Sequence, residues 1–233
     1  MKKLFFLLFA VGTLSFVACN NETKSAEQET EGAEQTEFPE ETGKVAIYNF
    51  DRDNSYVTWK ASKAVGGSHH GKVLVSDGRV AVEGGNIYGG ETTIDMATIA
   101  VEDEDASTTE NLTGHLKSPD FFDVEKYPFS TFQIVQIQPF DGSEGYNFTL
   151  RGDLRVKEVS KPVTIPCSVS ITPEKVTIKS PPFTINRTEW GINYNSGILG
   201  TVADKIINDD IELTINVVAN RRQLNALFTI YDI

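Results

Sequence analysis

The chain has 233 residues and a formal net charge of −12 at neutral pH, because 33 acidic side chains face 21 basic ones. This acidic balance repels phosphate backbones and anionic membrane surfaces, which argues against nucleic-acid binding. Cys19 and Cys167 are the two cysteines of the sequence. No disulfide framework is therefore expected, and the hydrophobic core must supply the stability.

The N-terminus resembles a bacterial secretory signal. Two lysines are followed by an apolar run from Leu4 to Phe9, and Ala18 precedes Cys19. The run is too short to stay in a membrane as a span. The Ala18–Cys19 pair resembles a lipobox, in which the cysteine sulfur receives a diacylglycerol and becomes the new N-terminus. We expect a signal peptide over residues 1–18 and a lipid anchor at Cys19; the alternative is a secreted protein in which Cys19 is incidental.

The residues next to the cleavage site bear on location. Removal of residues 1–18 takes away Lys2 and Lys3, so the net charge moves from −12 to −14. Asn20 follows the cysteine, where an aspartate is the better-known signal for retention in the inner membrane. The expected location is the cell envelope, with the outer membrane favoured. The sequence leaves open whether the protein faces the periplasm or the medium.

Residues 19–44 are rich in glutamate and polar residues, and Phe38 is almost the only large apolar group among them. Such a segment cannot bury enough surface to offset its chain entropy. We therefore expect a disordered acidic tether that holds a domain roughly 25–30 Å from the membrane.

From residue 45 onward, short runs of alternating apolar and polar residues are separated by Gly, Asp, Asn and Pro. In the clearest run, from Tyr146 to Val156, the apolar residues share one face and the polar residues share the other. A period of two with one apolar face predicts a half-buried strand. The remaining candidates are 55–62, 71–76, 79–83, 86–96, 129–138, 163–171, 174–179, 183–187 and 211–219.

These strands predict an all-β fold over residues 45–220, an antiparallel barrel of about eight strands. Closing the sheet removes exposed strand edges, which promote aggregation. One segment differs: Ser107–Glu110 resembles a capping box, and Leu112 and Leu116 follow four residues apart. We expect one short helix over about 107–118, ended by Pro119, near an opening of the barrel.

Five blocks in chain order carry a family resemblance: 51–59, 84–101, 115–132, 152–163 and 186–192. The most specific block is His-Leu-Lys-Ser-Pro-Asp-Phe-Phe-Asp-Val-Glu-Lys-Tyr-Pro, which begins at His115. The sequence resembles the YceI-like family of exported lipocalin-like barrels, which are associated with polyisoprenoids and related long lipids. The resemblance covers roughly residues 48–219. The tail 221–233 departs from the family, and its role stays open.

The resemblance implies a barrel that encloses a long apolar ligand, such as a polyisoprenoid or an isoprenoid quinone. Leu116, Phe121 and Phe122, which lie in or just after the helix, are the candidates for the mouth. The ligand-binding candidates are Trp59, Leu116, Phe121, Phe122, Phe132, Tyr146, Phe148, Leu150, Leu154, Ile165, Phe183, Ile185 and Leu213. The same side chains would also suit a solid core, since an eight-stranded barrel is just filled or just wide enough for one ligand. Gly152, set within this bulky face, suggests free space.

Metal binding and catalysis have weaker support. His69 and His70 are adjacent, so in a strand they should point to opposite faces, and no further ligand spacing surrounds them. His115 should hold the helix to the barrel by a hydrogen bond, or else touch a ligand head group. Cys167 lies on an apolar strand face and should be buried and unreactive.

No nucleophile or zinc motif of the common hydrolases occurs in the sequence. Asp120, Asp123 and Glu125 are explained by helix capping and turn formation. Around the Trp190–Gly191 turn, Arg187 and Glu189 should form an ion pair or bond the backbone. We therefore expect no enzyme, no metal and no cofactor.

The leading hypothesis is an exported lipoprotein that binds, sequesters or carries a long apolar ligand inside its barrel. The second is a membrane-tethered protein-interaction module, whose barrel would be filled and which would show a contiguous exposed apolar patch. An enzyme is the third. The sequence does not indicate an oligomeric state.

Overall fold

The computed structural model describes residues 38–140, 145–197, 200 and 202–222. The expected signal peptide, the anchor at Cys19 and most of the expected tether lie outside the described residues, as does the tail from 223 onward. Residues 38–44 have no regular structure. The guanidinium carbon of Arg79 lies 3.9 Å from the centroid of the Phe38 ring.

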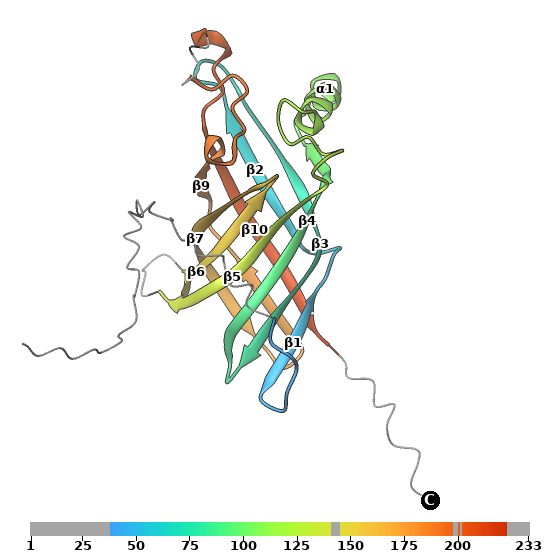
Figure 1. Cartoon of the computed structure of the whole chain (residues 1–233), viewed down its shortest axis with the longest axis vertical. Helices are drawn as coiled ribbons and strands as arrows, with labels where there is room; N and C mark the ends of the chain where they lie inside the picture. Colours follow the sequence, from blue (N-terminus) through green and yellow to red (C-terminus); the bar gives the residue numbers. More distant parts are fainter. Residues whose placement is uncertain (1–37, 141–144, 198–199, 201, 223–233) are drawn as a thin grey trace, which may run out of the picture. The chain divides into compact units, whose positions relative to one another are not determined.

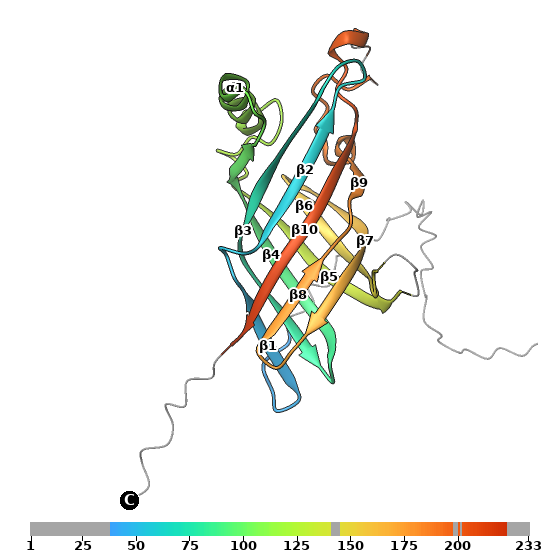
Figure 2. The same cartoon turned by 180° about the vertical axis from the view of Figure 1, so that it is seen from behind.

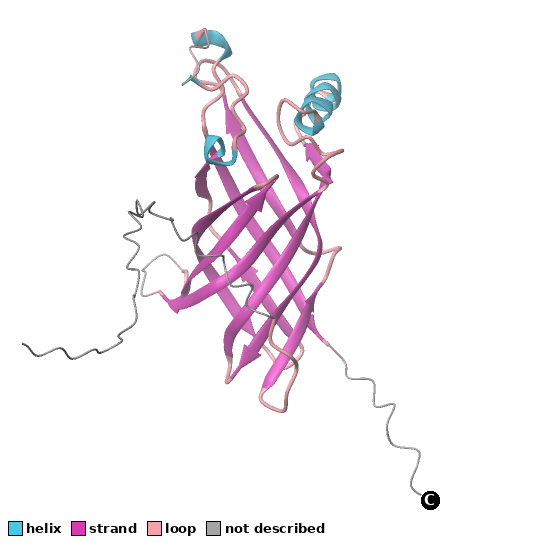
Figure 3. Cartoon of the chain, viewed as in Figure 1, coloured by secondary structure: helices cyan, strands magenta, loops and turns pink. Residues whose placement is uncertain are grey.

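A single antiparallel sheet closes into a barrel (Figures 1 and 3). The strands are β1 (Val45–Phe50), β2 (Tyr56–Ser62), β3 (Ser68–Glu83), β4 (Asn86–Val101), β5 (Phe129–Pro139), β6 (Phe148–Val156), β7 (Val159–Ile171), β8 (Lys175–Lys179), β9 (Phe183–Asn186) and β10 (Asp210–Arg221). Among the described residues, the ring runs β2-β3-β4-β5-β6-β7-β8-β10 and returns to β2. The expected eight-stranded barrel is confirmed.

At two places around the ring, one long strand pairs along its length with two short strands, one after the other. β3 pairs with β2 through its first half and with β1 through Arg79–Glu83. β10 pairs with β9 at its start and with β8 through Asn216–Asn220.

The alternation in the sequence predicts the first strand at 55–62, and β1 is an additional strand that it does not predict. Residues 51–54 form a turn in which the Asp51 carboxylate accepts a hydrogen bond from the Asn54 side chain, 3.0 Å long. The expected strands 71–76 and 79–83 are one strand, β3. The ladder continues through Asp77 and Gly78, which pair with β4 across a bulge.

The helix α1 (Ala106–Lys117) follows β4 and confirms the expected short helix. Its N-cap is Asp105, not the expected Ser107: the Asp105 carboxylate accepts a hydrogen bond from the Thr108 amide at 3.0 Å. The Ser107 hydroxyl donates to the same carboxylate, and Leu116 is buried. α1 lies at the same end of the barrel as the β2–β3 turn (Figures 1 and 2), here called the α1 end.

Alternation of buried and exposed residues is plain in β7, where Val163, Ile165, Cys167 and Val169 point inward and are buried. Inward side chains from the other strands join them to form the core. No helix of the described residues is both long and apolar enough to cross a membrane.

Candidate functional site

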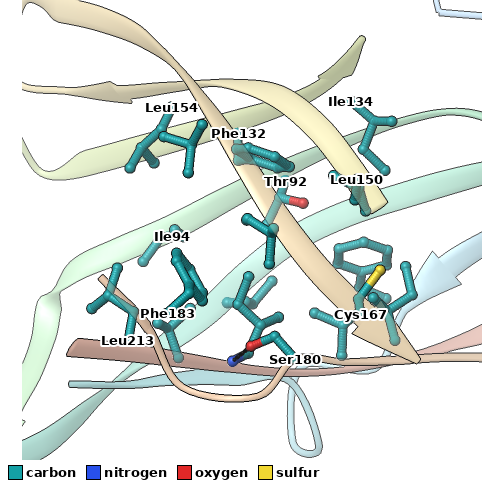
Figure 4. A pocket seen from close by; sticks show the side chains of 18 residues that line it. Thr92, Ile94, Phe132, Ile134, Leu150, Leu154, Cys167, Ser180, Phe183 and Leu213 are labelled. Atoms are coloured by element: carbon teal, nitrogen blue, oxygen red, sulfur yellow. Dashed lines mark hydrogen bonds between the residues drawn. The ribbon is translucent and has the colours of Figure 1, made fainter. Parts of the chain in front are cut away.

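The barrel interior contains a cavity of about 90 Å³ (Figure 4). Its 18 lining residues come mainly from the inward faces of strands around the ring, and nearly all are apolar. The Ser180 hydroxyl is one exception, but it is engaged, since it accepts a hydrogen bond from the Ile215 amide at 2.9 Å. This inner cavity therefore offers a ligand apolar contact with little polar anchoring.

A second cavity of about 160 Å³ lies between the inner cavity and α1. Val57, Ile94, Leu154 and Leu213 line both cavities and thus form the partition between them. The second cavity is also predominantly apolar. Among the described residues, Arg187 is the charged side chain that lines it.

A wider mouth pocket of about 480 Å³ lies at the α1 end. It shares Trp59, Leu116 and Phe121 with the second cavity, together with Ala61 and Ile207. The polar and charged groups of the mouth pocket are Ser62, Lys63, His69, Thr108, Asn111, His115, Tyr194, Asn195, Asp204 and Lys205. A polar mouth thus leads to two apolar cavities in series.

Most of the residues expected to bind ligand line these cavities. The inner cavity has Phe132, Leu150, Leu154, Ile165, Phe183 and Leu213, and the second cavity has Trp59, Leu116, Phe121, Phe122 and Ile185. Tyr146 and Phe148 line none of the three. Tyr146 precedes β6 and is half-buried, and Phe148 packs against core side chains near Cys167.

The structure adds lining residues that the sequence analysis did not single out. Val57 stands two residues before Trp59, Met96 two after Ile94, and Ile211 two before Leu213. The period-two pattern already put each pair on one strand face, so the signal was present.

Gly152 does not leave free space, contrary to the expectation. A β-carbon there would lie 2.3 Å from Cζ of Phe132. The missing side chain of Gly152 is replaced by the aromatic ring of the neighbouring strand.

The adjacent histidines on β3 both contact one carboxylate, although only His69 lines the mouth pocket and the His70 side chain is 60% exposed. Nδ1 of His69 lies 2.5 Å from one oxygen of Asp103, and Nδ1 of His70 lies 3.0 Å from the other. These contacts lower the pKa of Asp103, chiefly through the hydrogen bond with His69. The described residues contain no group of three or more His, Cys, Asp or Glu side chains placed to hold a metal ion.

His115 bonds within its own segment. Its Nε2 lies 3.0 Å from Asp120, just beyond the end of α1, and its ring packs edge-on against Tyr194 at 4.7 Å between centroids. His115 of α1 thus contacts Tyr194, another lining residue of the mouth pocket, through the two aromatic rings. The hydrogen bond expected to join the helix to the barrel goes to Asp120 instead.

Arg187 begins the short 3-10 helix η1 (Arg187–Trp190) and is 4% exposed. It binds main-chain carbonyls beside the mouth pocket, which Tyr194 and Ile207 line. Its donors go to the carbonyls of Ile192, Tyr194, Ile207 and Asn208, at 2.8 to 3.2 Å. Its ion pair is with Asp209 at 3.0 Å, not with Glu189. Burial lowers the pKa of Arg187, and the Asp209 charge opposes that effect. These bonds tie residues 192–194 and 207–209 to Arg187 at the start of η1.

With this geometry in place, the comparison with known proteins is direct. A family model described as "YceI-like domain" matches residues 48–219. The chain belongs to the YceI-like family. The resemblance seen in the sequence is confirmed at the level of the family.

Several relatives of this YceI-like chain are informative. A UPF0312 protein of Pseudomonas putida is 28% identical over 121 residues, which are 51% of this chain and 59% of that protein. The match thus spans about three fifths of the curated relative. The crystal structure of Burkholderia cenocepacia BcnA has a TM-score of 0.57 at 22% identity and covers 73% of this chain and 99% of its own.

A second solved structure is described as a polyisoprenoid binding domain from Saccharophagus degradans implicated in plant cell wall breakdown. It has a TM-score of 0.52 at 11% identity and covers 77% of this chain and all of its own. At these identities the two structures establish a shared fold.

Proposed function

We propose that this YceI-like protein is a binding protein rather than an enzyme, and that it holds one long apolar molecule inside its barrel. The observation that carries this proposal is the pair of apolar cavities in series below a polar mouth. These cavities favour a ligand over the filled barrel that the interaction-module hypothesis requires. The neighbour described as polyisoprenoid binding supports a polyisoprenoid, an isoprenoid quinone or a similar lipid as the ligand.

The driving force would be burial of apolar surface. Transfer of apolar area out of water contributes about 25 cal/mol per Å². The inner cavities are smaller than the roughly 300–1,000 Å³ of common ligand pockets. A thin prenyl or alkyl chain suits them better than a fused-ring molecule, and it would widen the partition at Val57, Ile94, Leu154 and Leu213 as it enters.

The direct test is to purify the full chain from its own cells, extract it with organic solvent and analyse the extract by mass spectrometry. Acyl chains bound covalently to Cys19 stay with the protein, so the extract reports the barrel contents. A stoichiometric long-chain lipid is expected. The absence of such a lipid, together with no change in melting temperature on adding polyprenols or quinones, would contradict the proposal.

A variant pair makes the test specific to the cavity. Leu213→Trp adds volume at the partition, whereas Val135→Trp adds the same side chain on β5 at a position that is 62% exposed. The first should lose most of the extracted lipid, and the second should keep it. Equal lipid content in the two variants would place the ligand elsewhere.

We further propose that the chain is exported and anchored by a lipid on Cys19, in the outer membrane. The Ala18–Cys19 pattern and Asn20 support this. Growth with an alkyne-tagged fatty acid should label the wild-type chain and leave Cys19→Ser unlabelled. Fractionation should then find the labelled chain with the outer membrane; inner-membrane recovery would contradict that location.

A further inference from the structure

The two tryptophans of the chain are both buried but differ in their hydrogen bonding. Trp190 is 4% exposed, and its indole N–H donates to the Leu154 carbonyl at 3.0 Å. Trp59 is 9% exposed, and its Nε1 is shielded from solvent without a hydrogen-bond partner among the described residues. Buried donors are normally paired, so an unpaired one needs an explanation.

Trp59 stands at the junction between the mouth and the interior. It lines both the mouth pocket and the second cavity, as do Leu116 and Phe121 at the α1 end. On β2 it pairs with Leu213 of β10 on one side and with Gly71 of β3 on the other. A β-carbon at position 71 would lie 1.9 Å from the Ala100 carbonyl oxygen and 2.8 Å from Cζ2 of Trp59, so the glycine allows both β4 and the indole to lie against the β3 backbone.

The surroundings indicate what kind of acceptor would suit this donor. In the second cavity the charged lining residue is Arg187, whose guanidinium is already bonded to four carbonyls and to Asp209. The charges in the mouth pocket include both signs, Lys63 and Lys205 against Asp204. Because the Nε1 of Trp59 is shielded from solvent, a charged head group would lose its hydration there, and a neutral oxygen suits this donor better.

We propose that the N–H of Trp59 binds a neutral oxygen, such as a carbonyl, at the head of the ligand. This inference rests on the proposed function and adds the chemistry of the head group and the orientation. The apolar chain lies in the two inner cavities, and its head stops at Trp59. The ligand passes Leu116 and Phe121, and a small rotation of the indole brings the N–H to the oxygen.

The test compares two probes of matched length on the full chain: geranylgeranylacetone, an isoprenoid methyl ketone, and the hydrocarbon in which two hydrogens replace the carbonyl oxygen. Wild type should bind the ketone about 5–10-fold more tightly by calorimetry, the effect of one net hydrogen bond. Trp59→Phe keeps an aromatic ring without the N–H and should lose this preference, so that it binds the ketone no more tightly than the hydrocarbon. Trp190→Phe is the matched control; it should lower the melting temperature and keep the preference.

A second measurement needs no variant. With ¹⁵N-labelled tryptophan the wild-type chain has two indole N–H signals. The Trp59 signal should lie further downfield in the ketone complex than in the hydrocarbon complex, whereas the Trp190 signal should have the same position in both, since both tryptophans line the second cavity. Equal affinities of wild type for the two probes, or the same position of the Trp59 signal in both complexes, would overturn the inference and leave the proposed function standing. Binding of neither probe would overturn both.

Discussion

Gly152 on β6 lies against the ring of Phe132 on β5, so that a β-carbon at 152 would lie 2.3 Å from Phe132 Cζ and 2.4 Å from the Gln133 carbonyl oxygen. The ring can turn aside, but the carbonyl belongs to the paired strand. We predict that Gly152→Ala destabilises the fold by about 1–3 kcal/mol, as overpacking in a well-packed core does. Urea unfolding followed by fluorescence measures the change.

The matched control for Gly152→Ala is the double variant with Phe132→Leu. It relieves the contact with the ring but not the contact with the carbonyl, so the double variant should lose less stability than the sum of the two single variants. Strict additivity would show that the ring does not take the space of the missing side chain.

Cys167 gives a prediction for alkaline pH. Burial raises the pKa of its thiol from 9.0 to about 11. Between these values the unfolded thiol loses its proton while the folded thiol keeps it, so stability falls as pH rises. At about 1.4 kcal/mol per pKa unit the loss approaches about 3 kcal/mol by pH 11. Unfolding free energies of wild type and Cys167→Ala, measured from pH 8 to 11, should therefore converge; parallel curves would contradict the shift.

The buried ion pair of Arg187 and Asp209 predicts a large loss of stability. Arg187→Met removes the cation and leaves the four carbonyls that it binds without this donor. The free energy of unfolding should fall by about 3–5 kcal/mol, as it does when a buried ion pair is broken. Arg79→Met, which breaks a half-exposed pair with Glu91, should cost about 0–1 kcal/mol. Both are read from thermal and urea unfolding, and similar losses in the two variants would argue against the assigned role.

The two candidate N-caps of α1 can be separated experimentally. Hydrogen bonds, chiefly from the Thr108 hydroxyl, lower the pKa of Asp105 below its usual 3.8. The cap is therefore present above that pH and is lost as pH falls through the lowered value. At neutral pH, Asp105→Ala should speed amide exchange over residues 106–110, and Ser107→Ala should not. Faster exchange in the Ser107 variant alone would restore Ser107 as the cap.

The amino-acid sequence carried enough information for the fold class, the short helix and the family. Period-two alternation in runs such as 163–171 marks which side chains face inward, because that depends only on the pleat of one strand. The period-two pattern does not predict β1, because Val45–Phe50 is short, follows the polar segment and lacks a clear alternation of its own. The capping-box pattern predicts Ser107 as the cap, because it does not show that a carboxylate just before it, that of Asp105, reaches the Thr108 amide.

What the tertiary structure decided is where space remains and which polar groups lack partners. Alternation places Trp59 and Leu213 on inward faces, but their pairing joins positions more than 150 residues apart in the chain. Cavity volume depends on how side chains from such distant strands meet, as at Gly152, where a ring closes the space that the sequence suggested was open. The unpaired N–H of Trp59 is likewise visible only once its neighbours on β3, β10 and α1 are in place.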